Sequence, residues 1–447
     1  MAASSPIPDA RALPLAGNIF ALLRDMRGFV TERYRELGPV YRIRVMNRRF
    51  TVLAGPEANR FVQRDGARHL RSYEYWSRFN ARFGAARSVL STDGAEHKAF
   101  RDVFKRAYSR RFAQDHASEL VDIARRSIAR WPRGTPFSVT PALQRIVTDQ
   151  VGTITTGVSP RPCNEELVHF VHVLLLTNII SIPFLDRSPR FRRAAARVDE
   201  LYRTVVERHT GERRNRGASD PDLIDELLDL HESDPGLLSE ADLKVSVLGP
   251  FIVALDTVAG TCSFMLYALL RDPDLLARAR AEADALFASG EPAWSDVEKL
   301  DVLHRTALET LRMYPTVPMM VRTVANSFEF AGYRIEAGEA VMAATTVPHY
   351  LPEFFPEPDR FDIERYTAAR AEHRRPYAYA PFGLGTHRCL GSGFAEVQIL
   401  LTIATVLHEA GLALHPGGYR LKTTEVPLPR PRDSFRVRAN PRAAYGN

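Results

Sequence analysis

The residue of this chain with the most distinctive chemistry is a cysteine in a glycine-rich segment. Cys389 lies in FGLGTHRCLG (382–391), directly after His387 and Arg388. Glycines allow tight bends and a close approach of the backbone to a ligand. Nearby cations, backbone N–H groups and the start of a following helix lower the pKa of a thiol and favour the metal-binding thiolate. A structural cysteine in a tight loop is the alternative, and this segment alone leaves it open.

Three further groups of charged residues have a suggestive spacing. Glu309 and Arg312 are three residues apart and share one face of a predicted helix. His97 and Arg101 are four apart on another predicted helix, which suits an anion with two oxygens. Arg360 lies in the turn PEPDRF (356–361). Taken singly, each group is more typical of a solvated surface than of a site.

A long apolar helix is predicted over residues 239–271. Ser239 and Asp242 fit a capping box, and the apolar run then continues until Asp272-Pro273 stops it. Such a helix is roughly 45 Å long and should cross the interior. Gly249-Pro250 predicts a kink or a late start. The helix carries one acid beside one alcohol, Asp256 and Thr257, in its apolar part.

The remaining segments predict a mainly helical chain with small β-sheets. Residues 39–55 alternate apolar and polar side chains around a short turn, as in a β-hairpin. Residues 328–341 resemble a second hairpin, and 411–438 resemble short irregular strands. A helix-like run directly follows the cysteine segment.

Composition narrows the class of protein. The 447 residues are 45% hydrophobic and 25% charged, as in ordinary globular proteins. The net charge is +7, but 53 acidic residues are interspersed along the chain. This interspersed negative charge disfavours nucleic acid as a partner. With only three cysteines and no Cys-x-x-Cys pair, neither a disulfide framework nor structural zinc is expected. The N-terminus lacks a signal-peptide pattern and the apolar window 171–185 is too short to span a bilayer, so a soluble cytoplasmic protein without a membrane anchor is expected.

Together, the motifs and their order resemble the cytochrome P450 superfamily of haem-thiolate monooxygenases, soluble bacterial type. The cysteine segment matches the family pattern at Phe382, Gly385, His387, Cys389 and Gly391. ETLR (309–312), PDRF (358–361), ALDT (254–257) and DGAEHKAFR (93–101) resemble further family motifs. The resemblance implies one P450 domain over 1–447, mainly α, with a β-rich part about 39–55 and 328–345. Haem would lie between the long central helix and the helix of the cysteine loop.

The resemblance also implies roles for individual residues around haem b. Cys389 would ligate the iron, and a thiolate ligand favours O–O cleavage. Phe382 would shield the sulfur and Gly391 would belong to the same cofactor-binding loop. The two propionates would be held by His97, Arg101, Arg322 and His387. Glu309, Arg312 and Arg360 would form a buried structural triad.

On the oxygen-binding side, Asp256 and Thr257 would deliver protons. A helix-interior threonine that bonds its own backbone is the alternative for Thr257. Val253 and Ala254 replace smaller residues that the family often has there, which narrows the pocket. The substrate pocket would draw on 72–90, 170–185, 247–257, 316–320 and 424–428, with Val253, Ala254, Val317, Met319 and Met320 as its named members.

The implied reaction inserts one oxygen atom from O₂ into a hydrophobic terpenoid, polyketide, steroid or fatty acid. Electrons would come from NAD(P)H indirectly, through a reductase and an acidic ferredoxin-type donor, to a monomeric enzyme. The cations expected to attract that donor are Lys98, Lys105, Arg106, Arg110 and Arg111. Oxidative coupling and peroxide-driven oxidation by the same fold remain alternatives, and a non-catalytic gas sensor is a more distant one.

Overall fold

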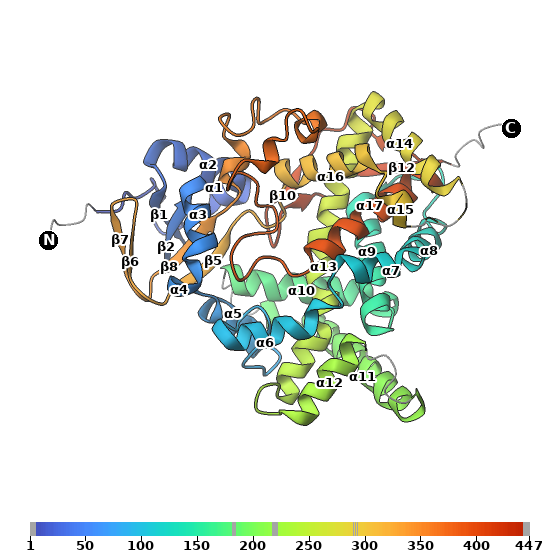
Figure 1. Cartoon of the computed structure of the whole chain (residues 1–447), viewed down its shortest axis with the longest axis horizontal. Coiled ribbons are helices and arrows are strands. Elements are labelled where there is room, and N and C mark those ends of the chain that lie inside the picture. Colours follow the sequence, from blue (N-terminus) through green and yellow to red (C-terminus); the bar gives the residue numbers. More distant parts are fainter. Residues whose placement is uncertain are drawn as a thin grey trace.

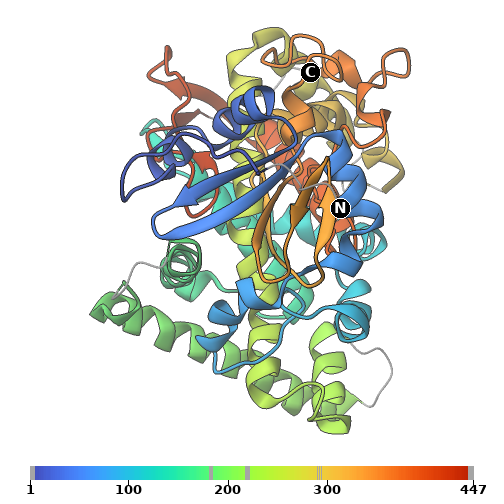
Figure 2. The same cartoon turned by 90° about the vertical axis from the view of Figure 1, so that its left-hand side faces the viewer.

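The computed structural model describes residues 6–180, 185–216, 222–288, 290, 292 and 294–440. Helices make up most of it (Figure 1; Figure 2), and most of the labelled strands lie on the side of the N-terminus, whereas β12 (Arg436–Asn440) lies on the side of the C-terminus (Figure 1). The larger α-helices are α2 (Met26–Leu37), α3 (Pro56–Arg64), α5 (Tyr73–Ala81), α6 (Gly94–Lys105), α8 (Ala117–Ile128), α9 (Val139–Thr156), α10 (Asn164–Ile180), α11 (Pro189–Arg216), α12 (Leu223–Ser233), α13 (Glu240–Arg271), α14 (Pro273–Phe287), α16 (Asp301–Met313) and α17 (Ser392–Glu409).

The shorter helical elements connect these. They are α1 (Ile19–Arg24), α4 (Gly66–His69), α7 (Arg110–Asp115), α15 (Trp294–Val297), and the 3₁₀ turns η1 (Arg161–Cys163), η2 (Leu185–Arg187), η3 (Val347–Tyr350), η4 (Ile363–Tyr366) and η5 (Glu372–Arg374). The mainly helical class predicted from the sequence is confirmed.

Helix α13 is the axis of the fold. Its capping box is present: the Ser239 hydroxyl accepts from the Asp242 N–H, and the Asp242 carboxylate accepts from the Ser239 N–H. The helix begins at Glu240 and runs through Pro250, so the alternative of a late start is wrong, because the cap fixes the first turn ahead of the proline. By length and composition α13 could cross a membrane, but 78% of its most apolar window is buried inside the protein. It is a core helix.

The predicted hairpin over 39–55 is confirmed as β1 (Val40–Val45) and β2 (Arg48–Ala54), which pair antiparallel. They belong to a five-stranded sheet of order β1-β2-β8-β5-β3, completed by β8 (Ala340–Ala344), β5 (Met320–Val324) and β3 (Leu70–Arg71). In the second predicted hairpin only β6 (Phe328–Phe330) and β7 (Tyr333–Ile335) pair with each other. Residues 340–344 instead lie parallel to β2, a partner distant in sequence.

The C-terminal strands expected over 411–438 are also present. They are β9 (Gly411–His415), β10 (Thr423–Thr424), β11 (Arg430–Pro431) and β12 (Arg436–Asn440). β12 lies between β9 and β4 (Phe137–Ser138), while β10 pairs with β11.

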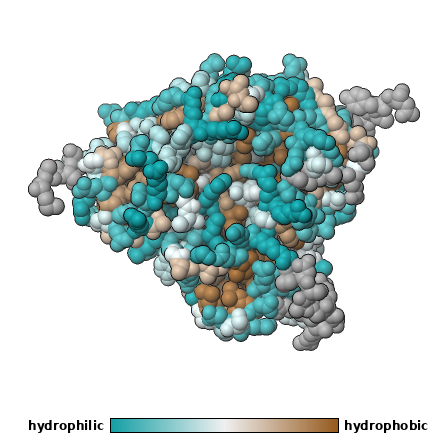
Figure 3. Space-filling model, viewed as in Figure 1, coloured by the Kyte–Doolittle hydropathy of each residue, from teal (hydrophilic) through white to brown (hydrophobic). Residues whose placement is uncertain are grey.

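Apolar burial joins the helices around α13. One core cluster joins α13 to α8, α9, α14, α16 and α17, and a second joins its N-terminal half to α6, α10, α11 and α12. The outer face in Figure 3 is mostly hydrophilic, with smaller hydrophobic areas toward its centre and lower edge. Since α17 follows the cysteine loop directly, this core fixes the loop relative to α13.

Candidate active site

The cysteine loop has a backbone that only glycine can follow at two positions. Gly383 and Gly385 adopt φ of +71° and +73°. A Cβ on Gly385 would lie 2.7 Å from the Val62 carbonyl oxygen, so this position also has no room for a side chain. The Cys389 N–H donates to the Phe382 carbonyl at 2.9 Å, which closes the loop just before α17. The sequence prediction of a tight, glycine-dependent loop is confirmed.

The net effect of the surroundings on the pKa of the Cys389 thiol differs from the predicted one. Burial raises the pKa of the thiol, while the Gly391 backbone N–H and the cations Arg101 and Arg388 lower it. The neighbours therefore act in the expected direction, but they do not reverse the effect of desolvation on the thiol pKa, although Cys389 as a whole is exposed. A metal ion that replaces the thiol proton supplies the missing stabilisation of the anion.

A group of basic residues meets beside the loop. The His97 and His387 rings lie 4.0 Å apart, and His387 Nε2 lies 2.9 Å from an oxygen of Asp93. Burial holds the pKa of His97 down to about 4, so its ring is neutral. Burial also lowers the pKa of Arg322 to about 10. Arg101 donates to the Arg388 carbonyl at 2.9 Å and thereby also holds the cysteine loop.

Two of these basic groups fit an acidic cofactor. Nδ1 of His97 is buried and has no hydrogen-bond partner within the described ranges. The Arg322 guanidinium donates to its neighbour's carbonyl, Val321 O, at 2.7 Å and forms no ion pair with a described carboxylate. A buried cation without a counter-ion is costly, whereas the carboxylates of a bound molecule would compensate both groups. The residues present therefore fit haem with its propionates.

Asp93 was missed as a site residue, although it is the first residue of the quoted DGAEHKAFR motif. Its carboxylate accepts from the backbone N–H groups of Ser72 and Tyr73 and faces His387. Burial opposes ionisation, but the His387 hydrogen bond and these N–H groups lower the pKa of Asp93. An ionised Asp93 thus ties the start of α5 to the cysteine loop.

One face of α13 borders open space although the helix is otherwise buried. The side chains at Val253 and Thr257, with Gly249 one turn earlier, are its accessible positions, spaced by four residues. Val253 is 41% exposed, and Val317 is 40% exposed. A spacing of four places residues on one helix face, so Val253 and Thr257 belong to one accessible stripe of α13.

The other predicted pocket residues divide into two groups. Ala254 is buried inside the helical core. Met319 and Met320 are half-buried and pack against the sheet, and a Cβ on Gly383 would lie 3.0 Å from the Met320 sulfur. Of the predicted stretch 170–185, residues 181–184 lie outside the described residues.

Asp256 and Thr257 point to different surroundings. The Thr257 hydroxyl donates to the Val253 carbonyl at 2.7 Å, which is the backbone-bonded arrangement weighed as the alternative. Asp256 is 2% exposed and accepts from Gln144 Nε2 of α9 at 2.7 Å. His172 Nε2 of α10 lies 3.0 Å from the same carboxylate oxygen. Neither His172 nor Gln144 was predicted from the sequence as a site residue.

The buried ion network contains Arg365 rather than Arg360. Glu309 and Arg312 are fully buried and form the predicted pair at 2.7 Å, and Arg365 Nε lies 3.2 Å from Glu309. The side chain of Arg360 is 67% exposed and pairs with Glu357 at 3.5 Å, so its predicted role is wrong. The 3₁₀ turn η4 directs Arg365 inward, whereas Arg360 contributes only its carbonyl, which accepts from Arg312 at 3.4 Å.

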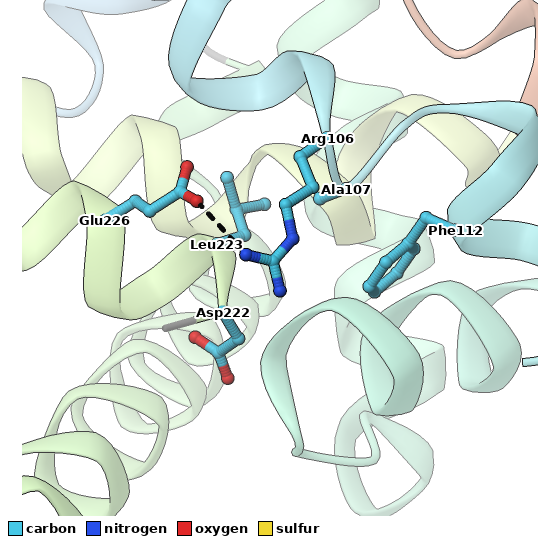
Figure 4. Close-up of a pocket in the computed structure, with 6 residues that line it drawn as sticks. All are labelled: Arg106, Ala107, Phe112, Asp222, Leu223 and Glu226. Carbon is cyan, nitrogen blue, oxygen red and sulfur yellow. Dashed lines mark ion pairs between the residues drawn. The ribbon is translucent and has the colours of Figure 1, made fainter. Parts of the chain in front are cut away.

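A small pocket lies beside α12 and contains none of the residues that fit the cofactor. Arg106, Ala107, Phe112, Asp222, Leu223 and Glu226 line it. The Arg106 guanidinium extends between the carboxylates of Glu226 and Asp222, and its distance to Glu226 is 4.0 Å (Figure 4). The pocket thus shows one of the predicted docking cations already paired with acids.

A mainly helical fold with a glycine-dependent cysteine loop, and with basic groups that fit haem propionates, is the arrangement expected of a haem-thiolate protein, and comparisons with known proteins identify the family. A family model described as Cytochrome P450 matches residues 7–436. The chain belongs to the cytochrome P450 family. It is therefore an oxidoreductase of the monooxygenase type, and the family implies haem as its cofactor.

The relatives and solved structures span nearly the whole chain. A putative cytochrome P450 120 from Synechocystis is 25% identical over 438 residues, 97% of either chain. The pentalenene oxygenase of Streptomyces avermitilis is 25% identical, with 91% of each chain covered. A solved cyanobacterial cytochrome P450 with bound retinoic acid superposes with a TM-score of 0.83 at 24% identity, over 98% of this chain and 100% of that one.

Proposed function

We propose that this cytochrome P450 inserts one oxygen atom from O₂ into a hydrophobic substrate, with a terpenoid as the first class to test. The observation that carries the proposal is the accessible stripe of Val253 and Thr257 on α13, with Val317 as a second exposed apolar side chain in the proposed pocket. Apolar side chains bind an apolar molecule by removing its surface from water. The relative named for pentalenene supports a hydrocarbon-rich substrate.

The proposed cofactor is haem b, with Cys389 as the iron ligand. Phe382 and Gly391 flank the sulfur, and His97, Arg101, Arg322 and His387 are the proposed partners of the propionates. When bound, haem supplies the activation of O₂. The protein holds the group between α13 and the cysteine loop, and the apolar stripe excludes bulk water from it.

The polar residues of α13 have the proposed task of moving protons. Reduction of O₂ consumes protons, and a hydroxyl at the pocket is suited to pass them on. Thr257 carries such a hydroxyl on the accessible stripe, although its hydrogen must first leave the Val253 carbonyl. Asp256, one residue before it, is the proposed acid that supplies this hydroxyl.

Electrons are proposed to come from an external ferredoxin-type donor and its NAD(P)H-dependent reductase. Most of the cations expected to attract the donor already have acidic partners: Lys98 pairs with Asp102, Arg106 with Glu226, Arg110 with Glu396 and Arg111 with Asp115. Such pairing weakens the net positive field, so we expect a docking surface of only modest salt dependence. We further propose a single catalytic domain, a monomer, and a cytoplasmic location.

The decisive test uses purified holoenzyme, a surrogate ferredoxin and reductase, and a panel of terpenoid hydrocarbons. Spin-state shifts of the iron select the compounds that bind, and product analysis with O₂ and reductant follows. Val253→Phe should weaken binding of the selected compound about tenfold, because the larger side chain occupies space next to the accessible stripe. Val103→Ala on α6, outside the stripe, is the control and should leave binding unchanged. Dimeric products would favour oxidative coupling. Product with peroxide but none with O₂ and reductant would favour peroxide-driven oxidation. A haem protein that forms no product with either oxidant would refute the proposal in favour of a gas sensor.

A further inference from the structure

The carboxylate of Asp256 is held by two helices on the side of α13 away from Thr257. Gln144 of α9 donates to its Oδ1 at 2.7 Å. Nε2 of His172 on α10 lies 3.0 Å from Oδ1 and 2.8 Å from Oδ2. Although Oδ2 is the nearer oxygen to Nε2, it has no hydrogen bond to any residue in the described part of the chain. One carboxylate oxygen is thus fixed while the other keeps its capacity to accept.

His172 links this buried carboxylate to solvent. Its side chain is 19% exposed, whereas that of Asp256 is 2% exposed. Asp256 faces His172 from α13. The charge of Arg430 from β11 interacts with Asp256, whereas Gln144 from α9 is uncharged. His169 lies one turn earlier on α10, where burial, then Arg190 of α11, then His172 hold its pKa down. A proton therefore has a route from water through the imidazole to the carboxylate.

The charges of the pair make a transfer between them useful. Burial alone would raise the pKa of Asp256, but the hydrogen bond and charge of His172, with Arg430 and Gln144, lower it. Pulling an ionised carboxylate away from an imidazolium in a buried place costs several kcal/mol. Once the proton has moved from Nε2 to the carboxylate, both groups are neutral, and the carboxylic acid can turn without separating charge.

We propose that His172 positions Asp256 and resupplies the proton that Asp256 delivers toward Thr257, an inference that rests on the proposed monooxygenase function. The step moves one proton from imidazolium Nε2 to a carboxylate oxygen of Asp256. The carboxylic acid turns to the Thr257 side and gives the proton up there. The freed Nε2 takes a proton from water, and the returning carboxylate restores the pair.

Two substitutions separate holding Asp256 from supplying its proton. His172→Gln keeps an N–H donor for the carboxylate but cannot carry a transferable proton, and His172→Phe removes both. His169→Gln is the matched control, because it changes a histidine of the same helix that has no contact with Asp256. In His172→Gln, product formed per reductant consumed should fall about tenfold, with hydrogen peroxide as the replacement product.

Further readouts distinguish a relay from a merely structural role. The solvent deuterium isotope effect should increase in His172→Gln. With added hydrogen peroxide, which brings its own protons, His172→Gln and wild type should differ less than about twofold. A readout independent of turnover is the ¹⁵N resonance of His172 Nε2, which should shift in Asp256→Asn.

The outcomes are separable from failure of the proposed function. If wild type forms product and His172→Gln matches it in coupling and isotope effect, the relay is refuted and the proposed function stands. An unchanged His172 resonance in Asp256→Asn would also refute the pairing. Absence of product from wild type with either oxidant would refute the proposed function itself.

Discussion

The finding that Arg365, and not Arg360, belongs to the buried ion network can be tested by measuring the stability of variants. Arg365 is 1% exposed and lies 3.2 Å from Glu309 and 2.9 Å from Glu372. Its guanidinium also donates to the carbonyls of Pro356 and Glu357 at 2.6 and 2.8 Å. Arg365→Met keeps much of the volume but removes every one of these interactions. Two buried carboxylates and three carbonyls, the third being that of Arg360 at 3.3 Å, then lose a donor.

Removing one partner of such a buried network costs about 3–5 kcal/mol. The entropy of unfolding is about 2.1 cal/mol/K per residue, so the 447 residues give roughly 0.9 kcal/mol/K. The expected drop in melting temperature for Arg365→Met is therefore about 3–5 °C. The assay is thermal and urea unfolding of the holoenzyme followed by circular dichroism.

Arg360→Met is the matched control in the same loop. Its side chain is exposed, and the contact that Arg312 makes with residue 360 is to the backbone carbonyl, which the substitution leaves in place. We expect a change within about 0.5 kcal/mol. Equal destabilisation by both substitutions, or a larger effect of Arg360→Met, would refute the assignment of Arg365 to the network.

Three further predictions concern the cofactor and one charged pair. Cys389→Ser should abolish the strongly red-shifted absorption of the reduced carbon monoxide complex while leaving the fold intact by circular dichroism. His97→Ala and Arg322→Met should each lower the haem content of purified protein severalfold, measured by pyridine haemochrome, without changing the far-UV spectrum. Asp222→Asn, which keeps a helix N-cap, should destabilise most between pH about 4 and 6.5, the interval in which Asp222 is ionised and His209 is charged. Burial opposes both charges, but their mutual hydrogen bond at 2.8 Å raises the pKa of His209 and lowers that of Asp222, so this stabilisation fades as pH rises through the folded-state pKa of His209. A destabilisation that is constant from pH 5 to 9 would contradict the pairing.

Local sequence patterns predicted the elements whose signals lie within a few residues. The capping box at Ser239 and Asp242, the β1–β2 hairpin and the glycine-dependent cysteine loop all belong to this group. In each case the stabilising contacts are near in sequence, so residue type and spacing carry the information. The pairing of β8 with β2 could not be predicted from such local patterns, because a parallel neighbour comes from a distant segment.

The partners of charged residues were harder to predict than the residues themselves. Glu309 and Arg312 share a helix face, and their pairing follows from their spacing. The third member comes from a loop that offers Arg360 and Arg365 five residues apart, and the direction of each side chain depends on whether the chain forms η4. Gln144 and His172 likewise reach Asp256 from α9 and α10, which no pattern around Asp256 records.

Because Asp256 and Thr257 are adjacent in an α-helix, their side chains point in different directions, which the sequence motif does not reveal. Successive residues of an α-helix point about 100° apart, so an acid and an alcohol next to each other need not share the same surroundings. Here Thr257 lies on the accessible stripe with Val253, and Asp256 is turned between α9 and α10. Any transfer between them therefore needs a rotation of the Asp256 side chain or a bridging water molecule. Under the proposed relay, the strength with which Gln144 and His172 hold the carboxylate sets how often that rotation occurs. The proposal therefore assigns control of the proton supply to these two positions and not to the acid and alcohol alone.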